Sequence, residues 1–255
     1  MSKNNYSPIW VSQNFLTSSK TIRRLINKTS INPRDHVIEI GPGKGHITAQ
    51  LLQYCQKVSA IELDKVLCEK LRIKYEKSDN LKLYNMDFLK WNLPAEGTYK
   101  IFANIPFCHT TDIIRKLVYS LNPPTEAWLI IEKGAAKRLM GTPSENKLSL
   151  NLKPLFEMNV IYHFKGDDFH PKPKVDIVML HIKRKIKSDI TKLEWRSYQN
   201  FIDNAIRNKG NGLRHIFTKR QLLKAFSAAG LNDSTSGEIL YIQWLCLFRC
   251  YSMFK

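Results

Sequence analysis

A glycine-rich turn between a strand-like and a helix-like segment is the feature that most constrains this chain. Residues 36–40 form a short apolar run, and glycines follow it at positions 41, 43 and 45. Residues 47–56 then repeat apolar side chains at helical spacing. Glycines at such a junction let the backbone turn sharply and approach a ligand at the amino end of a helix. Because residue 46 is His, the spacing departs from the Gly-x-Gly-x-x-Gly dinucleotide signature, and alone it also fits a simple tight turn.

Strand-like and helix-like segments alternate along the first half of the chain. Apolar runs typical of buried strands recur at 58–62, 81–84, 100–103 and 127–131, and helical patterns occupy 65–77 and 112–120. This alternation predicts a parallel sheet with covered faces. Residues 162–165 and 176–183 form a further predicted strand pair, expected to be antiparallel at one edge. The predicted fold class is therefore α/β, with a Rossmann-like sheet.

The last quarter of the chain has a different, helical pattern. Residues 183–189 are basic and hydrophilic, and we expect a linker there. Thr191 and Thr218 are candidate helix caps, the second in a capping box with Gln221, and 239–251 is rich in apolar and aromatic residues. The sequence therefore predicts two domains: residues 1–185, catalytic with a basic N-terminal arm, and residues 186–255, small and all-helical.

Basic residues are concentrated at the two ends of the chain. The 255 residues carry a formal net charge of +18, and residues 1–34 together with 184–255 hold +14 of it. This clustering favours a polyanion gripped by the ends, and nucleic acid fits best, so we expect the helical domain to be RNA-associated. An acidic membrane surface is the alternative, but no amphipathic Lys/Trp helix supports it, and no run of about 18 apolar residues would span a bilayer. Without the apolar core of a signal peptide, a cytoplasmic protein is expected, with a monomer as the default.

Cysteine and histidine usage points away from a disulfide framework and from a metal site. The five cysteines are odd in number and lack Cys-x-x-Cys spacing, and the seven histidines are scattered without ligand spacing. We therefore expect free, mostly buried thiols and no metal.

Acidic residues follow the second and third predicted strands. Glu62 ends the run 58–62, where a carboxylate would accept both hydroxyls of a ribose. Asp87 and Phe88 follow the third strand, where a carboxylate would accept from an adenine amino group and a ring would pack on the base. Open α/β sheets bind ligands at the carboxyl ends of their strands. S-adenosylmethionine, with a ribose, an adenine and a positive centre but no phosphate, fits these acids and the glycine turn.

The most specific motif is Asn104-Ile105-Pro106-Phe107, which ends the fourth predicted strand. The Asn104 side-chain oxygen and the Ile105 carbonyl would hold the two hydrogens of a nucleobase amine. Pro106 would fix the backbone so that this carbonyl faces the site, and Phe107 would stack on an extruded base. An ordinary Asn-x-Pro turn after a strand is the structural alternative.

Motifs spread from about residue 10 to residue 250 resemble those of the ribosomal RNA adenine dimethyltransferases, a superfamily with Erm and KsgA branches. The matching stretches are 12–15 (Ser-Gln-Asn-Phe), 39–45, Glu62, Asp87, 104–107 and 169–175 (Phe-His-Pro-Lys-Pro-Lys-Val). Ile105 favours the Erm branch, because KsgA relatives commonly carry Leu there. The stretch 216–221 also favours Erm, because KsgA relatives usually show a different basic helix start.

The resemblance implies a role for each matching residue. The residues it places around S-adenosylmethionine are Asn14, Leu16, Gly41, Pro42, Gly43, Glu62, Leu63, Asp87, Phe88 and Asn104. Those it places at the target base are Asn104, Ile105, Pro106, Phe107 and Phe169, with the two Phe rings on opposite faces of the base. This sequence departs from the family at Phe107, where members usually have Tyr, and at Pro42, where several Erm relatives have Ser or Ala.

Basic residues beside the predicted site would supply most of the RNA affinity through phosphates. The candidates are Lys133, Lys137, Arg138, Lys172 and Lys174. Because Lys137 and Arg138 are adjacent, we expect only one of them to face the RNA, and an ordinary solvated helix face is the alternative.

The function implied by the resemblance is S-adenosylmethionine-dependent methylation of the exocyclic amine of one adenine in the peptidyl-transferase loop of 23S rRNA. This modification, with one methyl group or two, would confer macrolide-lincosamide-streptogramin B resistance. One alternative is a KsgA-type enzyme that acts on small-subunit rRNA in ribosome biogenesis. Another is a non-catalytic nucleic-acid-binding protein on the same fold. A DNA adenine methyltransferase is disfavoured, because Ile105 rather than Pro precedes Pro106.

Overall fold

The structure, a computed structural model, describes residues 15–105, 109–207, 212–232 and 239–254. Internal contacts divide the chain into two compact units. The first unit comprises the chain up to Ala136 together with Asn159–Arg184. The second comprises Lys137–Met158 and Lys185–Lys255. One junction therefore lies beside the predicted boundary at residue 185, while residues 137–158 belong with the second unit.

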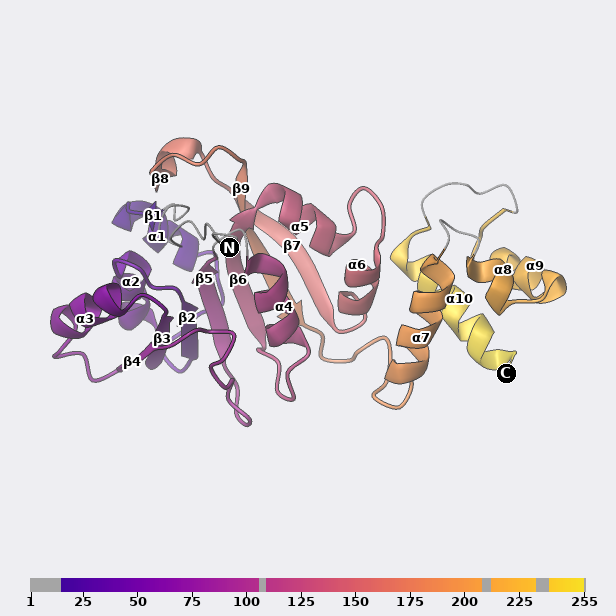
Figure 1. The fold of residues 1–255 in the computed structure, drawn as a ribbon, viewed down its shortest axis with the longest axis horizontal. Coiled ribbons are helices and arrows are strands. Elements are labelled where there is room, and N and C mark those ends of the chain that lie inside the picture. Colours follow the sequence, from indigo (N-terminus) through magenta and orange to yellow (C-terminus); the bar gives the residue numbers. More distant parts are fainter. Residues whose placement is uncertain (1–14, 106–108, 208–211, 233–238, 255) are drawn as a thin grey trace, which may run out of the picture. The chain divides into compact units, whose positions relative to one another are not determined.

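A seven-stranded sheet with the order β4-β3-β2-β5-β6-β9-β7 forms the centre of the first unit (Figure 1). Its strands are β2 (His36–Ile40), β3 (Lys57–Glu62), β4 (Leu81–Asn85), β5 (Lys100–Asn104), β6 (Glu126–Glu132), β7 (Phe156–His163) and β9 (Ile177–Arg184). The neighbours from β4 to β6 pair in parallel, and β9 pairs with β6 in antiparallel fashion. The predicted α/β class is confirmed. Strand β7 lies at the edge beside β9 but begins six residues before the expected run at 162.

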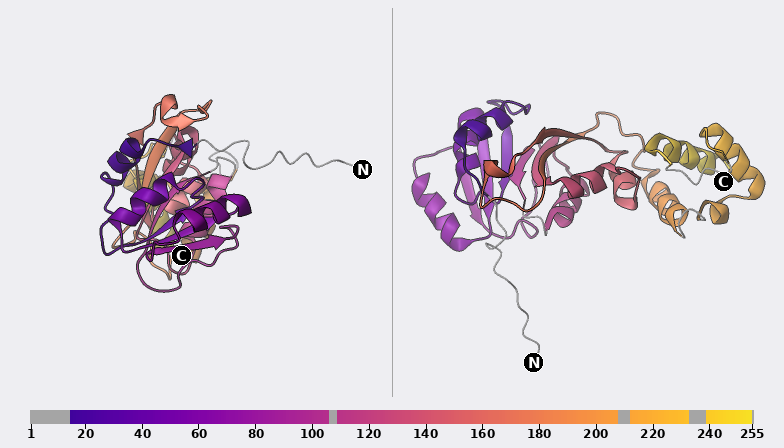
Figure 2. Two further views of the ribbon diagram at one scale, coloured as in Figure 1. Left: turned by 90° about the vertical axis from the view of Figure 1, so that its left-hand side faces the viewer. Right: turned by 90° about the horizontal axis from the view of Figure 1, so that it is seen from above.

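Helices cover both faces of this sheet (Figures 1 and 2). They are α1 (Ser19–Ile26), α2 (His46–Tyr54), α3 (Lys65–Lys74), α4 (Thr110–Val118) and α5 (Lys133–Met140). Helix α3 begins where the Asp64 carboxylate caps it by accepting from the N–H groups of Val66 and Leu67. Because both faces are covered, the central strands are apolar almost throughout, as in the buried run Val37-Ile38 of β2.

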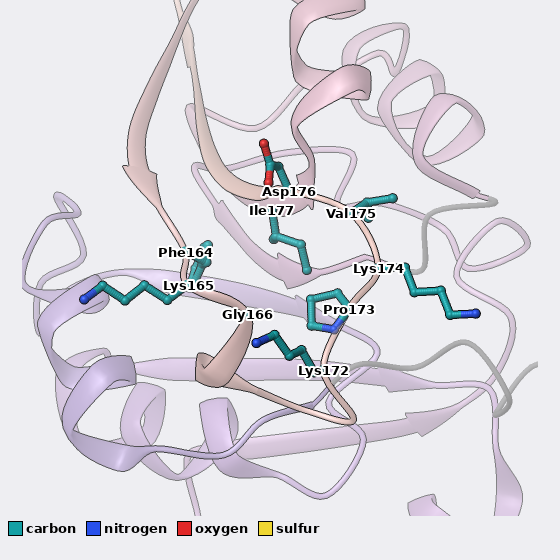
Figure 3. A pocket seen from close by; sticks show the side chains of 9 residues that line it. All are labelled: Phe164, Lys165, Gly166, Lys172, Pro173, Lys174, Val175, Asp176 and Ile177. Atoms are coloured by element: carbon teal, nitrogen blue, oxygen red, sulfur yellow. The ribbon is translucent and has the colours of Figure 1, made fainter.

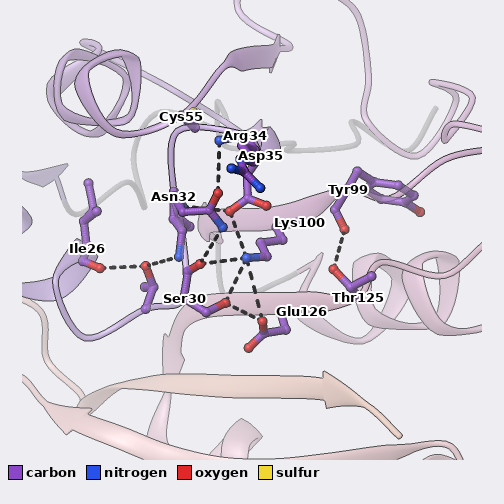
Figure 4. A network of polar contacts seen from close by, with 12 residues as sticks. Ile26, Ser30, Asn32, Arg34, Asp35, Cys55, Tyr99, Lys100, Thr125 and Glu126 are labelled. Atoms are coloured by element: carbon purple, nitrogen blue, oxygen red, sulfur yellow. Dashed lines mark hydrogen bonds and ion pairs between the residues drawn. The ribbon is translucent and has the colours of Figure 1, made fainter. Parts of the chain in front are cut away.

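A polar network ties together the amino ends of the central strands (Figure 4). The Lys100 ammonium at the start of β5 lies 2.8 Å from the Asp35 carboxylate, just before β2, and 2.7 Å from the Ser30 carbonyl. The Glu126 carboxylate at the start of β6 lies 3.9 Å from the same ammonium and 2.7 Å from His181 Nε2. These contacts fix the strand ends opposite to those that carry the predicted site residues.

The second unit is helical and has its own core. Its helices are α6 (Lys147–Leu152), α7 (Trp195–Ile206), α8 (Gly212–Ile216), α9 (Lys219–Ala228) and α10 (Tyr241–Met253). Buried aromatic side chains from α7 and α10 dominate that core, with Tyr198 packed edge-on against Phe248 at 5.1 Å between ring centroids. The capping box of Thr218 and Gln221 is confirmed.

One expectation for this region was wrong, and another needs a fuller description. Helix α7 begins at Trp195 rather than after Thr191, whose hydroxyl instead pairs with the Glu194 carboxylate at 2.7 Å. The basic stretch 183–189, the expected linker, contains the junction between the two units, which falls after Arg184, and its later residues are bonded within the second unit. The Lys185 ammonium binds the Asp189 carboxylate at 2.6 Å, and the Tyr241 hydroxyl donates to the same carboxylate at 2.6 Å.

Candidate active site

The predicted site residues converge at one edge of the sheet because their strands are parallel. The glycine turn follows β2, Glu62 ends β3, and Asn104 ends β5. The register pairs Ile40 with Ile61 on one side and with Ala103 on the other, so these strands end side by side. The carboxyl-end edge therefore gathers the glycine loop, an acid and an amide.

The glycine loop, residues 41–45, adopts a conformation that other residues rarely tolerate. Gly41 has a φ of 66° and Gly43 a φ of 58°, in the left-handed region. A Cβ on Gly43 would lie 2.8 Å from the Phe15 ring, so the loop approaches that ring as closely as only glycine permits. Helix α2 then begins at His46 without a side-chain cap.

Glu62 is a buried carboxylate held by two backbone N–H groups. It is 2% exposed, its Oε2 accepts from Gly43 N–H at 2.9 Å, and its Oε1 accepts from Asp64 N–H at 2.9 Å. Burial raises the pKa of this carboxyl, although the two N–H groups work in the opposite direction. The bonds fix both oxygens beside the glycine loop, as a ribose acceptor requires.

Glu39, in the middle of β2, is a second buried acid, for which the sequence reasoning assigned no role. It is 1% exposed, and the hydroxyl and N–H of Thr48 face its carboxyl and work to lower its pKa. Burial, with the nearby Glu62 charge, raises the pKa of Glu39 to about 8. The sequence signal for it was an acid within an otherwise apolar strand that leads into the glycine loop.

Asp87 and Phe88 lie at the end of β4, as expected, but their side chains are already engaged. The Asp87 Oδ1 accepts from Leu89 N–H at 2.9 Å. Phe88 is buried and stacks on Trp91 at 6.3 Å between ring centroids. Packing of the Phe88 ring on an adenine therefore stays a prediction. Exposed apolar surface at these strand ends comes instead from Leu63 and Met86, each about half exposed.

The target-base residues are only partly described. Asn104 is half-buried at the end of β5, and buried Ile105 donates its N–H to the Ile130 carbonyl at 3.1 Å. The remaining predicted residues Asn14, Pro106 and Phe107 lie outside the described residues. Phe169 is 5% exposed and packs against Phe164 at 5.1 Å between ring centroids. Stacking of Phe169 on a base stays a prediction, and in this structure neighbouring side chains cover its ring.

A two-stranded ladder joins the predicted cofactor and base segments. Strand β1 (Phe15–Leu16) pairs antiparallel with β8 (Phe169–His170), with Phe15 opposite His170 and Leu16 opposite Phe169. Leu16 and Phe169 are both buried in the same hydrophobic cluster. The predicted cofactor residue Leu16 thus lies directly beside a predicted base residue.

A basic pocket lies beside β8 (Figure 3). Residues 164–166 and 172–177 line it, and they include Lys165, Lys172 and Lys174. Lys172 pairs with the exposed Asp167 at 2.9 Å. Two of the predicted RNA contacts, Lys172 and Lys174, therefore line one pocket.

The other three predicted RNA contacts belong to α5. Lys133 pairs with the exposed Asp176 at 3.2 Å. Lys137 and Arg138 are both exposed and belong to the second unit. The expectation that only one of these two faces the RNA stays untested.

Metal, disulfide and membrane-spanning features are each absent from the described residues. No group of three His, Cys, Asp or Glu side chains that would hold a metal occurs among them. The four described cysteines, Cys55, Cys68, Cys246 and Cys250, are free thiols; Cys108 lies outside the described residues. None of the described helices has the length and apolar character needed to cross a membrane.

The residues at this edge fit S-adenosylmethionine. The carboxylate of Glu62, fixed by two backbone N–H groups, suits the ribose hydroxyls, and the half-exposed Leu63 offers an apolar surface to a purine. When bound, S-adenosylmethionine supplies an electrophilic methyl group on a sulfonium sulfur.

Comparison with known proteins gives consistent results. A family model described as ribosomal RNA adenine dimethylase matches residues 6–249. The chain is 37% identical over 244 residues to an rRNA adenine N-6-methyltransferase of Lysinibacillus sphaericus, covering 96% of each protein. It is 35% identical, with the same coverage, to one of Limosilactobacillus reuteri. The crystal structure of the 23S rRNA methyltransferase ErmE shares the fold, with a TM-score of 0.84 and 24% sequence identity over 94% of this chain and 100% of that one.

Proposed function

Because the chain belongs to the ribosomal RNA adenine dimethylase family, and is by that membership an S-adenosylmethionine-dependent rRNA adenine N-6-methyltransferase, we propose a specific target for it. The target is the exocyclic amine of one adenine in the peptidyl-transferase loop of 23S rRNA. Such methylation protects the ribosome from macrolide, lincosamide and streptogramin B antibiotics. In this proposal the protein acts in the cytoplasm as a monomer. Its substrate is 23S rRNA that is free or still being assembled into the ribosomal subunit.

One observation carries this proposal. Asn104 ends β5 at the same sheet edge where Glu62 ends β3 and the glycine loop follows β2. An amide acceptor beside a cofactor site suits a target amine, whose two hydrogens need acceptors. The choice of 23S rRNA is supported by Ile105, and by relatives that include a solved 23S rRNA methyltransferase.

The main contribution of the protein to methyl transfer would be to position the two reactants. Methyl transfer by direct displacement needs the amine nitrogen, the methyl carbon and the sulfur in line. Correct alignment of bound reactants contributes about 7–11 kcal/mol of barrier reduction. Asn104 would hold the amine, and Glu62 with the glycine loop would hold the cofactor. The target adenine must leave its stack at a cost of a few kcal/mol, which aromatic stacking at roughly 1–3 kcal/mol per base would offset.

The second unit would contribute RNA affinity. The sequence from residue 204 to residue 232 contains six basic residues and no acidic one. The described basic residues of this stretch are all exposed: Arg207, Arg214, Lys219, Arg220 and Lys224. A surface with this charge supports binding to RNA phosphates, in keeping with an RNA-associated C-terminal domain.

The direct test is methyl transfer from radiolabelled S-adenosylmethionine to protein-free 23S rRNA, beside intact small ribosomal subunits. We expect label on a single adenine of the free 23S rRNA, and none on the small subunits. Label on the small subunits alone would reject the 23S assignment in favour of the biogenesis branch. No label on either, with no binding of S-adenosylhomocysteine, would favour a non-catalytic nucleic-acid-binding protein. Digestion of labelled RNA to nucleosides would separate mono- from dimethyladenosine.

A further inference from the structure

We propose that Phe15 is a positioning residue that couples cofactor binding to target-base binding. Its side chain contacts the glycine loop, and its backbone holds the strand that carries Phe169. This inference rests on the proposed function, because it takes the glycine loop as the cofactor loop and β8 as the base-side segment. It adds a role for Phe15, which ends the matching motif 12–15 but to which that motif gave no role.

The first half of the link runs from the glycine loop to the Phe15 ring. A Cβ on Gly43 would meet the Phe15 Cε1 atom at 2.8 Å, which is closer than real Cβ contacts come. The Lys44 ammonium lies 5.1 Å from the centre of the same ring, within cation–π range. Two successive loop residues therefore contact Phe15, and the loop cannot shift without moving that ring or breaking these interactions.

The glycine that touches Phe15 also touches the expected ribose acceptor. Gly43 N–H donates to Glu62 Oε2 at 2.9 Å. A ribose hydroxyl that donates to this carboxylate oxygen shares it with Gly43 N–H, because each carboxylate oxygen can accept two hydrogen bonds. A bound ribose would therefore be linked through this shared oxygen to Gly43, the residue packed against the Phe15 ring.

The second half of the link runs from Phe15 to the base side. Phe15 pairs with His170 and Leu16 pairs with Phe169 in the β1–β8 ladder. Successive strand residues point to opposite faces, so Phe15 faces the loop while Leu16 packs with Phe169 in the hydrophobic cluster. A displacement at the loop is thereby passed through two residues to the segment that carries Phe169. Because Phe169 is nearly fully buried here, uncovering its ring for a base requires such a displacement.

The test measures the coupling itself. The affinity of the wild-type protein for the RNA that it methylates is determined with and without saturating S-adenosylhomocysteine. We expect the analogue to tighten RNA binding at least fivefold, the lower end of typical couplings between sites. Phe15→Ala should reduce this factor to below twofold, lower kcat, and raise the KM for S-adenosylmethionine. Phe15→Tyr, which keeps the ring, should restore the coupling.

A control variant separates positioning from loss of stability. Ile26→Val, on α1 and outside the glycine loop, shortens a buried side chain of the hydrophobic cluster that holds Leu16 and Phe169. It should lower the thermal unfolding midpoint but keep the wild-type coupling factor. The inference fails if Phe15→Ala retains wild-type coupling, or if the wild-type protein shows none while it still methylates the RNA. If the wild-type protein methylates no RNA, the proposed function fails instead.

Discussion

The cofactor end of the sheet and the basic surface beside β8 are both charged, yet they are built in opposite ways. At the cofactor end, Glu62 is buried and both of its oxygens are held by backbone N–H groups. On the basic surface, Lys172 is exposed and pairs with an exposed aspartate that is free to exchange partners. Under the proposed function, the small cofactor would be recognised by groups that are fixed before it arrives. The RNA would instead be recognised by exposed charges that exchange one partner for another.

The largest effect should follow a change at the fixed end, at Asn104. Asn104→Ala removes the acceptor that would hold the target amine, and we expect kcat for methyl transfer to fall by about 10²–10³-fold, as for removal of a preorganised hydrogen-bonding group. RNA affinity should stay within about twofold of wild type, because phosphate contacts supply most of it. Single-turnover methylation and RNA titration measure the two quantities. A fully active variant would reject the role of Asn104, and an equal loss of RNA affinity would make it a binding residue.

The two regions also differ in how far the sequence alone foretold them. The glycine loop, Glu62 and Asn104 were predicted because each lies at a strand end, and parallel strands bring their ends to one edge whatever the details of packing. The pairing of Lys133 with Asp176 was not predicted, because its partners are 43 residues apart and meet only once β6 and β9 pair.

Two further features escaped prediction for the same long-range reason. Phe169 begins the motif 169–175, which suggests an open stacking face, but the pairing of β8 with β1 places its side chain in the core. Residues 137–158 carry no local signal for the second unit, and joining it depends on contacts such as the Tyr198 hydroxyl bond to the Leu150 carbonyl at 2.8 Å. The residues at the strand ends could therefore be predicted from the sequence, whereas the pairing of distant residues could not.

A second prediction concerns the buried acid Glu39, beside the glycine loop, and the pH dependence of stability. Burial raises the pKa of Glu39 from 4.5 to about 8, so between these values the folded protein keeps a proton that the unfolded chain has released. The free energy of unfolding should therefore fall as pH rises across this window, by at most about 1.4 kcal/mol per pH unit from this group. Glu39→Gln mimics the protonated acid and removes that dependence. The stability advantage of the variant over wild type should be small near pH 5 and much larger at pH 8.

Thermal or urea unfolding at both pH values measures this difference. Glu76→Gln, at an exposed position of the same unit, is the matched control and should give the same stability difference from wild type at both. If the difference between Glu39→Gln and wild type does not grow from pH 5 to pH 8, Glu39 is not the protonated, buried group described here.

The smallest effect should come from the exchangeable surface. Lys172→Gln combined with Lys174→Gln removes two cations beside the pocket, and we expect RNA affinity to fall by roughly tenfold or less. The plot of log affinity against log salt should become shallower by about 0.7–0.9 for each phosphate that the protein no longer neutralises. Asp167→Asn should have the opposite effect and strengthen RNA binding slightly, because it releases Lys172 from its 2.9 Å ion pair.

Lys57→Gln combined with Lys77→Gln, at exposed positions of the same unit, is the charge-matched control and should leave the slope unchanged. Equal slopes for the two double variants would show that net charge alone, rather than this pocket, attracts the RNA. If Lys172→Gln combined with Lys174→Gln also lowered the affinity for S-adenosylhomocysteine, the basic surface and the proposed cofactor site would not be separate regions.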